Sequence, residues 1–90
     1  MIGKQEYEIA IVSKYKEAKK ALEILNDSEL KLAIFSKCDT AIQLILLKAT
    51  DDDLVLPSDF NYLRLKANAL LDDLLVYFKE EIEKTGGLFL

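Results

Sequence analysis

The sequence contains no histidine, and this removes the side chain used most often as a general base and as a metal ligand near neutral pH. Every Ser–His or Cys–His nucleophilic arrangement is excluded with it. The single cysteine, Cys38, excludes an internal disulfide or a multi-cysteine zinc site. Glycine occurs only at positions 3, 86 and 87, so the sequence has no glycine-rich phosphate-binding loop. We therefore expect a protein that is not an enzyme and that binds no cofactor or metal.

Long apolar runs are missing as well. Lys4, Glu6 and Glu8 interrupt the start of the chain, which argues against a signal peptide. The longest uncharged stretch near the middle, residues 40–47, is far shorter than the roughly 20 residues that cross a bilayer. With a lone cysteine, these features favour a soluble protein of the reducing cytoplasm that does not enter a membrane.

The residues that are present favour helices. The chain is 51% apolar and 31% charged with one proline, a composition typical of a globular domain with few turns. Apolar residues recur at steps of three and four, which predicts a single all-α domain over residues 1–90. We expect a three-helix antiparallel (up-down-up) bundle with helices at about 5–25, 29–49 and 59–85, followed by an apolar tail at 86–90.

The same periodicity predicts the core. On the first helix the expected core residues are Ile11, Tyr15, Ala18, Leu22 and Leu25. On the second they are Leu30, Ile34, Phe35, Cys38, Ala41, Ile42, Ile45, Leu46 and Ala49. On the third they are Phe60, Leu63, Ala67, Leu70, Leu71, Leu74, Leu75, Tyr77, Phe78 and Ile82. Asp27 or Ser28 is expected to cap the second helix, and Ser58 or Asp59 the third. At least one residue of Leu54–Leu56 should pack on the end of the bundle.

Apolar residues also occupy the side of two helices that faces away from this core. On the third helix they form a stripe of Tyr62, Leu65, Ala69 and Val76, which we call the outer stripe; Asp72 and Asp73 flank it. Leu44 and Leu47 make a narrower stripe on the second helix, and Leu88, Phe89 and Leu90 end the chain. Contiguous exposed apolar residues invite association, so these nine residues are the predicted protein contacts. The alternative is that the tail or a bend in the first helix covers the outer stripe.

The charged residues suggest weaker sites. Asp51–Asp53 with Asp59 could gather a hard cation, but they lack the spacing and the glycine of a calcium loop. Arg64 is expected to pair with Asp59 or with these aspartates. The lysines of segment 14–20 form a modest basic strip that acids interrupt, while the whole chain carries a net charge of −4. Nucleic-acid binding is therefore disfavoured.

Two families of small helical domains are similar in architecture. Residues 17–49 resemble the paired central helices of HEPN domains, whose nucleases use an Arg followed by a His; without histidine such a domain would be non-catalytic. Three-helix MIT adaptor domains are similar in size and helix count. The sequence carries no motif of either family, so the likeness is one of architecture.

We predict a non-enzymatic protein–protein interaction module. Its partner would be itself, as a homo-dimer, or a larger complex in which it is a small accessory subunit. The alternative is a nucleic-acid-associated helical domain, HEPN-like but non-catalytic, that uses the Lys14–Lys20 strip.

Overall fold

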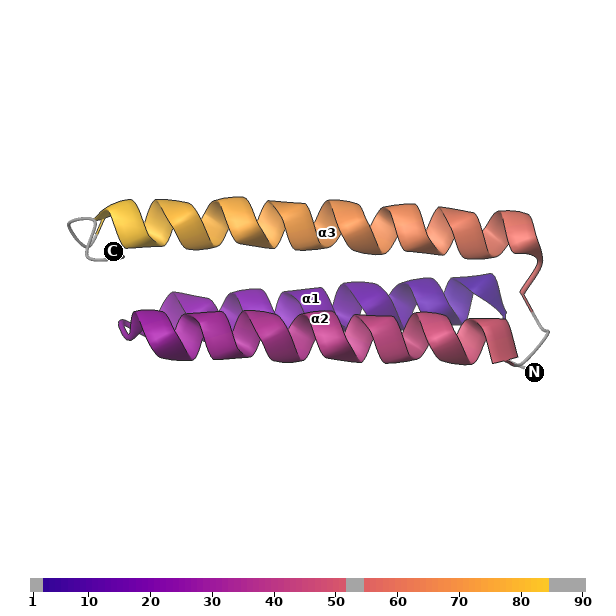
Figure 1. Cartoon of the computed structure of the whole chain (residues 1–90), viewed down its shortest axis with the longest axis horizontal. Helices are drawn as coiled ribbons and strands as arrows, with labels where there is room; N and C mark the ends of the chain where they lie inside the picture. The colour runs from indigo at the N-terminus through magenta and orange to yellow at the C-terminus, as the bar shows by residue number, and fades with distance from the viewer. Residues whose placement is uncertain (1–2, 52–54, 85–90) are drawn as a thin grey trace.

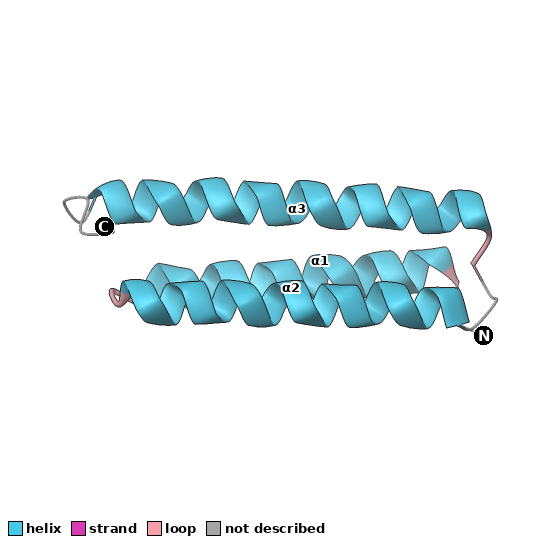
Figure 2. Ribbon diagram, viewed as in Figure 1, coloured by secondary structure: helices cyan, strands magenta, loops and turns pink. Residues whose placement is uncertain are grey.

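The computed structural model describes residues 3–51 and 55–84 and contains three α-helices: α1 (Lys4–Ile24), α2 (Ser28–Asp51) and α3 (Pro57–Lys84). The helices run up, down and up along a rod of 47 × 17 × 17 Å, and each helix contacts the other two (Figures 1 and 2). The predicted three-helix bundle is confirmed. The rod is about as long as α3 itself, since 28 residues at about 1.5 Å per residue span about 42 Å.

Side-chain contacts between helices fix their register. Tyr15 of α1 hydrogen-bonds Asp73 of α3, and Lys19 lies over the ring of Tyr77, so α1 and α3 are parallel. Lys31 near the start of α2 meets Glu81 near the end of α3, so these two helices are antiparallel. α3 therefore packs along both α1 and α2.

The core is a single cluster along the axis of the rod. Its largest fully buried side chains are Ile11, Leu22, Ile42, Leu63 and Leu74, from all three helices. Almost every predicted core residue of the described part is buried or half-buried. Leu30 is the clearest error, because it is 50% exposed while its neighbour Lys31 is only 3% exposed. The helix turns about 100° per residue, and at this end it is Lys31 that points towards α3.

Of the two helix caps predicted from the sequence, the structure confirms one. Asp27 caps α2, since its Oδ1 accepts hydrogen bonds from the amides of Glu29 (2.9 Å) and Leu30 (3.2 Å). The predicted cap of the third helix is wrong: α3 begins at Pro57, which places Ser58 and Asp59 inside its first turn. Proline suits the first helical position because its amide has no partner there.

The connection before α3 also closes the bundle. Val55 packs against the core, whereas Leu56 is 67% exposed. This confirms that one apolar residue of the joint covers the end of the bundle. Leu54 lies outside the described residues.

Candidate interaction surfaces

The outer stripe of α3 faces away from α1 and α2. Leu65 is 62% exposed, Val76 54% and Tyr62 41%, and Ala69 between them is also exposed. A bend of α1 over the stripe is not observed. The first turn of α1 reaches only the end of the stripe, where Lys4 Nζ lies 4.5 Å from the centre of the Tyr62 ring. The described residues thus leave an apolar face open on the longest helix.

Charged side chains border the stripe on both sides. Asp72 is exposed, and Asp73 accepts a hydrogen bond from the hydroxyl of Tyr15 at 3.0 Å. Burial, followed by the hydrogen bond and the negative charge of Asp73, raises the pKa of Tyr15. The expectation that Asp73 only frames the patch is therefore incomplete, since this residue also ties α3 to α1.

A second exposed apolar face lies on α2. Leu44 is 61% exposed and Leu47 60%, as the sequence pattern predicts for side chains opposite the core. Leu44 lines a shallow depression on α2 together with Ser36, Lys37, Thr40 and Ala41. The third predicted contact, Leu88, Phe89 and Leu90, lies outside the described residues.

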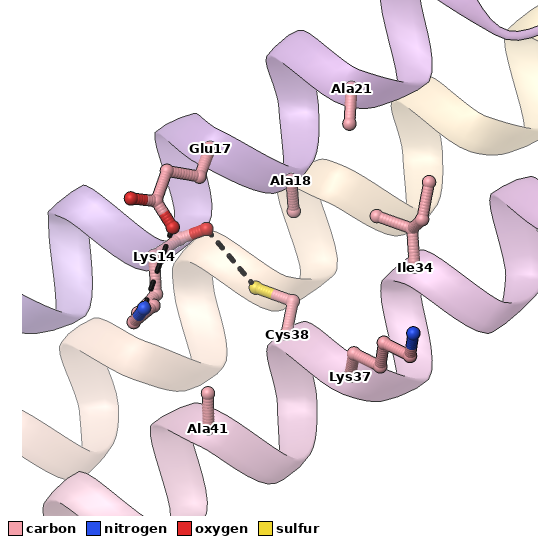
Figure 3. Close-up of a pocket in the computed structure, with 8 residues that line it drawn as sticks. All are labelled: Lys14, Glu17, Ala18, Ala21, Ile34, Lys37, Cys38 and Ala41. Atoms are coloured by element: carbon pink, nitrogen blue, oxygen red, sulfur yellow. Dashed lines mark hydrogen bonds and ion pairs between the residues drawn. The ribbon is translucent and has the colours of Figure 1, made fainter.

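Leu44 also lines a shallow depression between α1 and α2, together with Tyr7, Ala10 and Ile45. Figure 3 shows a separate depression between the same two helices around Cys38, with a volume of about 310 Å³. Small side chains form its floor, and Lys14, Glu17 and Lys37 stand at its rim. The depression is lined by Lys14, Glu17, Ala18, Ala21, Ile34, Lys37, Cys38 and Ala41.

Cys38 is a core residue and not an activated nucleophile. It is 5% exposed, and its Sγ lies 3.6 Å from the carbonyl oxygen of Lys14, to which the thiol donates. Burial, and next the charge of Asp39, raises the pKa of the thiol, so the reactive thiolate is disfavoured. This matches the sequence interpretation of Cys38 as a small buried hydrophobic residue.

The basic strip of α1 is divided among several faces. Lys14 points to the α2 side and lies 3.5 Å from Glu17. Lys19 lies over Tyr77, at 5.5 Å from the ring centre. Lys16 and Lys20 are exposed. Two of the four lysines therefore have partners within the bundle, and the strip is not the continuous basic face that phosphate contacts need.

The aspartates around the second joint do not converge within the described part of the chain. Asp59 pairs with Lys4 at 3.7 Å and not with Arg64, which is exposed; of the two predicted partners of Arg64, Asp59 is therefore wrong, and the aspartates of the joint stay a prediction. Asp52 and Asp53 lie outside the described residues. Among residues 3–51 and 55–84 no group of three or more Cys, Asp or Glu side chains could hold a metal ion. No helix in the same ranges is long and apolar enough to cross a membrane.

Sequence reasoning missed the buried pair of Lys31 and Glu81. The side chain of Lys31 is 4% exposed and its Nζ lies 3.9 Å from Oε2 of Glu81, whose side chain is 24% exposed. The signal was available: Lys31 precedes Cys38 by seven residues and so shares its face of the helix. A lysine on an apolar helix face indicates a buried partner.

Comparison with known proteins gives no further guide. No protein-family model, curated protein or solved structure matches this chain significantly.

Proposed function

We propose that this protein is a non-enzymatic protein–protein interaction module, which associates with itself or joins a larger complex as a small subunit. One observation carries the proposal: α3 closes a well-filled core with one face and exposes Tyr62, Leu65, Ala69 and Val76 on the opposite face. Burying a Leu or Val completely contributes roughly 1.5–3 kcal/mol. A partner that covers this face recovers part of that free energy.

The absence of histidine and the buried, unactivated Cys38 support a binding role over a catalytic one. The lone cysteine supports a place in the reducing cytoplasm. The exposed Leu44 and Leu47 of α2 are the second candidate contact.

The test is a matched pair of substitutions. Leu65→Glu puts a charge into the outer stripe, and Ile9→Glu puts the same charge on α1 at a residue of equal exposure, 61% against 62%. Ile9 lies outside the proposed contacts. We expect Leu65→Glu to abolish self-association, or retention of a purified partner, and Ile9→Glu to leave both unchanged, with circular dichroism showing that both variants fold.

Equal behaviour of the two variants would refute the proposal. A measurement of DNA and RNA binding completes the experiment. If DNA or RNA is bound at low salt, and Lys16→Glu with Lys20→Glu weakens that binding, the basic strip is the functional surface instead.

A further inference from the structure

We infer that the occupant of the outer stripe is a second copy of this chain, whose α3 lies antiparallel against the first about a two-fold axis. This inference rests on the proposed function and adds the identity and direction of the partner. It follows from the order of side chains along the exposed face of α3.

The outer stripe belongs to a longer exposed row with a seven-residue repeat. Tyr62, Ala69 and Val76 are seven residues apart, and Leu65 begins a second series that continues at Asp72 and Lys79. All six side chains are exposed. Two interleaved series at this spacing follow the pattern with which one helix packs along another, with apolar residues at four of the six positions and the charged Asp72 and Lys79 at the other two.

Direction is decided by charge. In a parallel pair each residue meets its own copy, so Asp72 faces Asp72 and Lys79 faces Lys79, and both contacts are repulsive. In an antiparallel pair the first series meets the second. Leu65 then packs on Val76 of the second copy, and Asp72 lies beside the small Ala69. Lys79 lies near the ring of Tyr62, a contact that a cation and an aromatic ring favour.

The same arrangement brings two oppositely charged residues together at the edge of the row. Lys66 and Asp73 each follow a residue of the second series, and an antiparallel pair brings Lys66 of each copy to Asp73 of the other. Lys66 is half-buried with no ion-pair partner among the described residues. Asp73 uses Oδ2 for Tyr15, which leaves Oδ1 for a second donor. At the ends Glu80 approaches Asp59 of the second copy; this contact between like charges is weakened because Lys4 pairs with Asp59 at 3.7 Å.

The charges of this surface also argue against other occupants. Lys66, Asp72, Asp73 and Lys79, the charged residues in the middle of this surface, carry two positive and two negative charges, so their formal charges sum to zero. A nucleic acid or a strongly charged protein would require an excess of one sign. A second copy of this chain, which brings Lys66 to Asp73, fits this balance.

The size of the contact predicts a reversible dimer. The row from Tyr62 to Lys79 is about 26 Å long, at about 1.5 Å per residue, and one helix, about 10–12 Å, wide. The contact therefore covers about 300 Å² per copy, against about 800 Å² in a standard stable interface. We expect dissociation at micromolar protein and dimers near millimolar protein.

Cysteine cross-linking tests the direction. In a Cys38→Ala background, Leu65→Cys and Val76→Cys proteins are mixed near millimolar concentration and oxidised with diamide. The antiparallel dimer predicts a disulfide between Leu65→Cys and Val76→Cys chains, and little cross-linking when either variant is oxidised alone. Strong cross-linking of Leu65→Cys with itself would overturn the inference in favour of a parallel pair.

Charge reversal tests the edge contact. Lys66→Glu should weaken the dimer about tenfold, because two ion pairs per dimer become repulsive, whereas Lys20→Glu on α1 should leave it unchanged. If the wild type stays monomeric near millimolar concentration while Leu65→Glu still abolishes binding of a different purified protein, the second copy is excluded and the proposed function stands. If Leu65→Glu alters neither, the proposed function fails as well.

Discussion

The buried Lys31–Glu81 pair leads us to predict that removing the charge of Lys31 stabilises the protein, although ion pairs are usually regarded as stabilising. The Lys31 side chain is 4% exposed, yet its nearest charged partner is 3.9 Å away and itself a quarter exposed. Removing an ammonium from water costs several kcal/mol, and attraction at this distance repays that cost only in part. Lys31→Met keeps most of the apolar stem and deletes the charge. We expect it to raise the free energy of unfolding by about 1–2 kcal/mol.

Glu81→Gln should have the opposite effect. It leaves the Lys31 ammonium enclosed without a counter-charge, which in a fully buried pair costs about 3–5 kcal/mol. Because Glu81 is partly exposed, we expect a loss of about 1–3 kcal/mol. The exposed contact of Glu81 with Lys84, at 3.4 Å, adds little to this loss. The double variant should recover wild-type stability or exceed it, since no charge remains buried.

Urea unfolding at neutral pH, followed by circular dichroism, measures all three variants. In a domain of this size 1 kcal/mol corresponds to roughly 4–8 °C in Tm, so thermal scans provide a second readout. A fall of more than about 1 kcal/mol in Lys31→Met would refute the reasoning, because the pair would then contribute more than its desolvation costs.

Two further variants and one measurement of thiol reactivity test the contacts between and within helices. Tyr15→Phe should lower stability at neutral pH by about 1–3 kcal/mol, since it removes a hydrogen bond to the charged Asp73. Because the pKa of Tyr15 is raised in the folded protein, its contribution to the free energy of unfolding is complete below pH ~10. This contribution is lost as the pH rises through the folded-state pKa. Tyr15→Phe should therefore flatten the alkaline fall of stability, and an unchanged fall would contradict this assignment. Asp27→Ala should cost about 1 kcal/mol through loss of the α2 cap; no change in Tm would show that the cap contributes nothing. Cys38 should react with Ellman's reagent at least about tenfold more slowly in the folded than in the unfolded protein, and equal rates would disprove its burial.

The sequence predicts the bundle well because helical periodicity is a local signal. Ile11, Ile42 and Leu74 lie on apolar stripes long enough to outweigh any single exception, and all three are buried. Helix ends depend on fewer residues. The sequence predicts the start of the third helix at about residue 59, but α3 begins at Pro57, a position in which a missing amide costs nothing.

Pairings between helices depend on the register, and periodicity alone does not determine the register. Lys31 belongs to the face of α2 that meets the end of α3, so its long stem and charge are enclosed with Glu81. Asp73 borders the outer stripe and still reaches Tyr15 of α1. Helical periodicity indicates the side of the helix on which each residue lies. The residues that it contacts on other helices depend on how the three helices pack.

The outer stripe was predicted from the sequence for the same reason as the core, since Leu65 and Val76 lie on the face of α3 opposite Leu74. The structure leaves both exposed. It also shows that Lys66, which the sequence pattern does not single out, lies half-buried at the edge of this stripe.

The most direct test of the interaction surface is sedimentation equilibrium of the wild type and of Leu65→Glu, from about 10 µM to about 1 mM protein. The wild-type mass should rise with concentration from 10.2 kDa towards twice that value, while Leu65→Glu stays at the monomer mass. A wild type that remains at 10.2 kDa near 1 mM, or a Leu65→Glu protein that associates equally well, would contradict self-association through the outer stripe of α3.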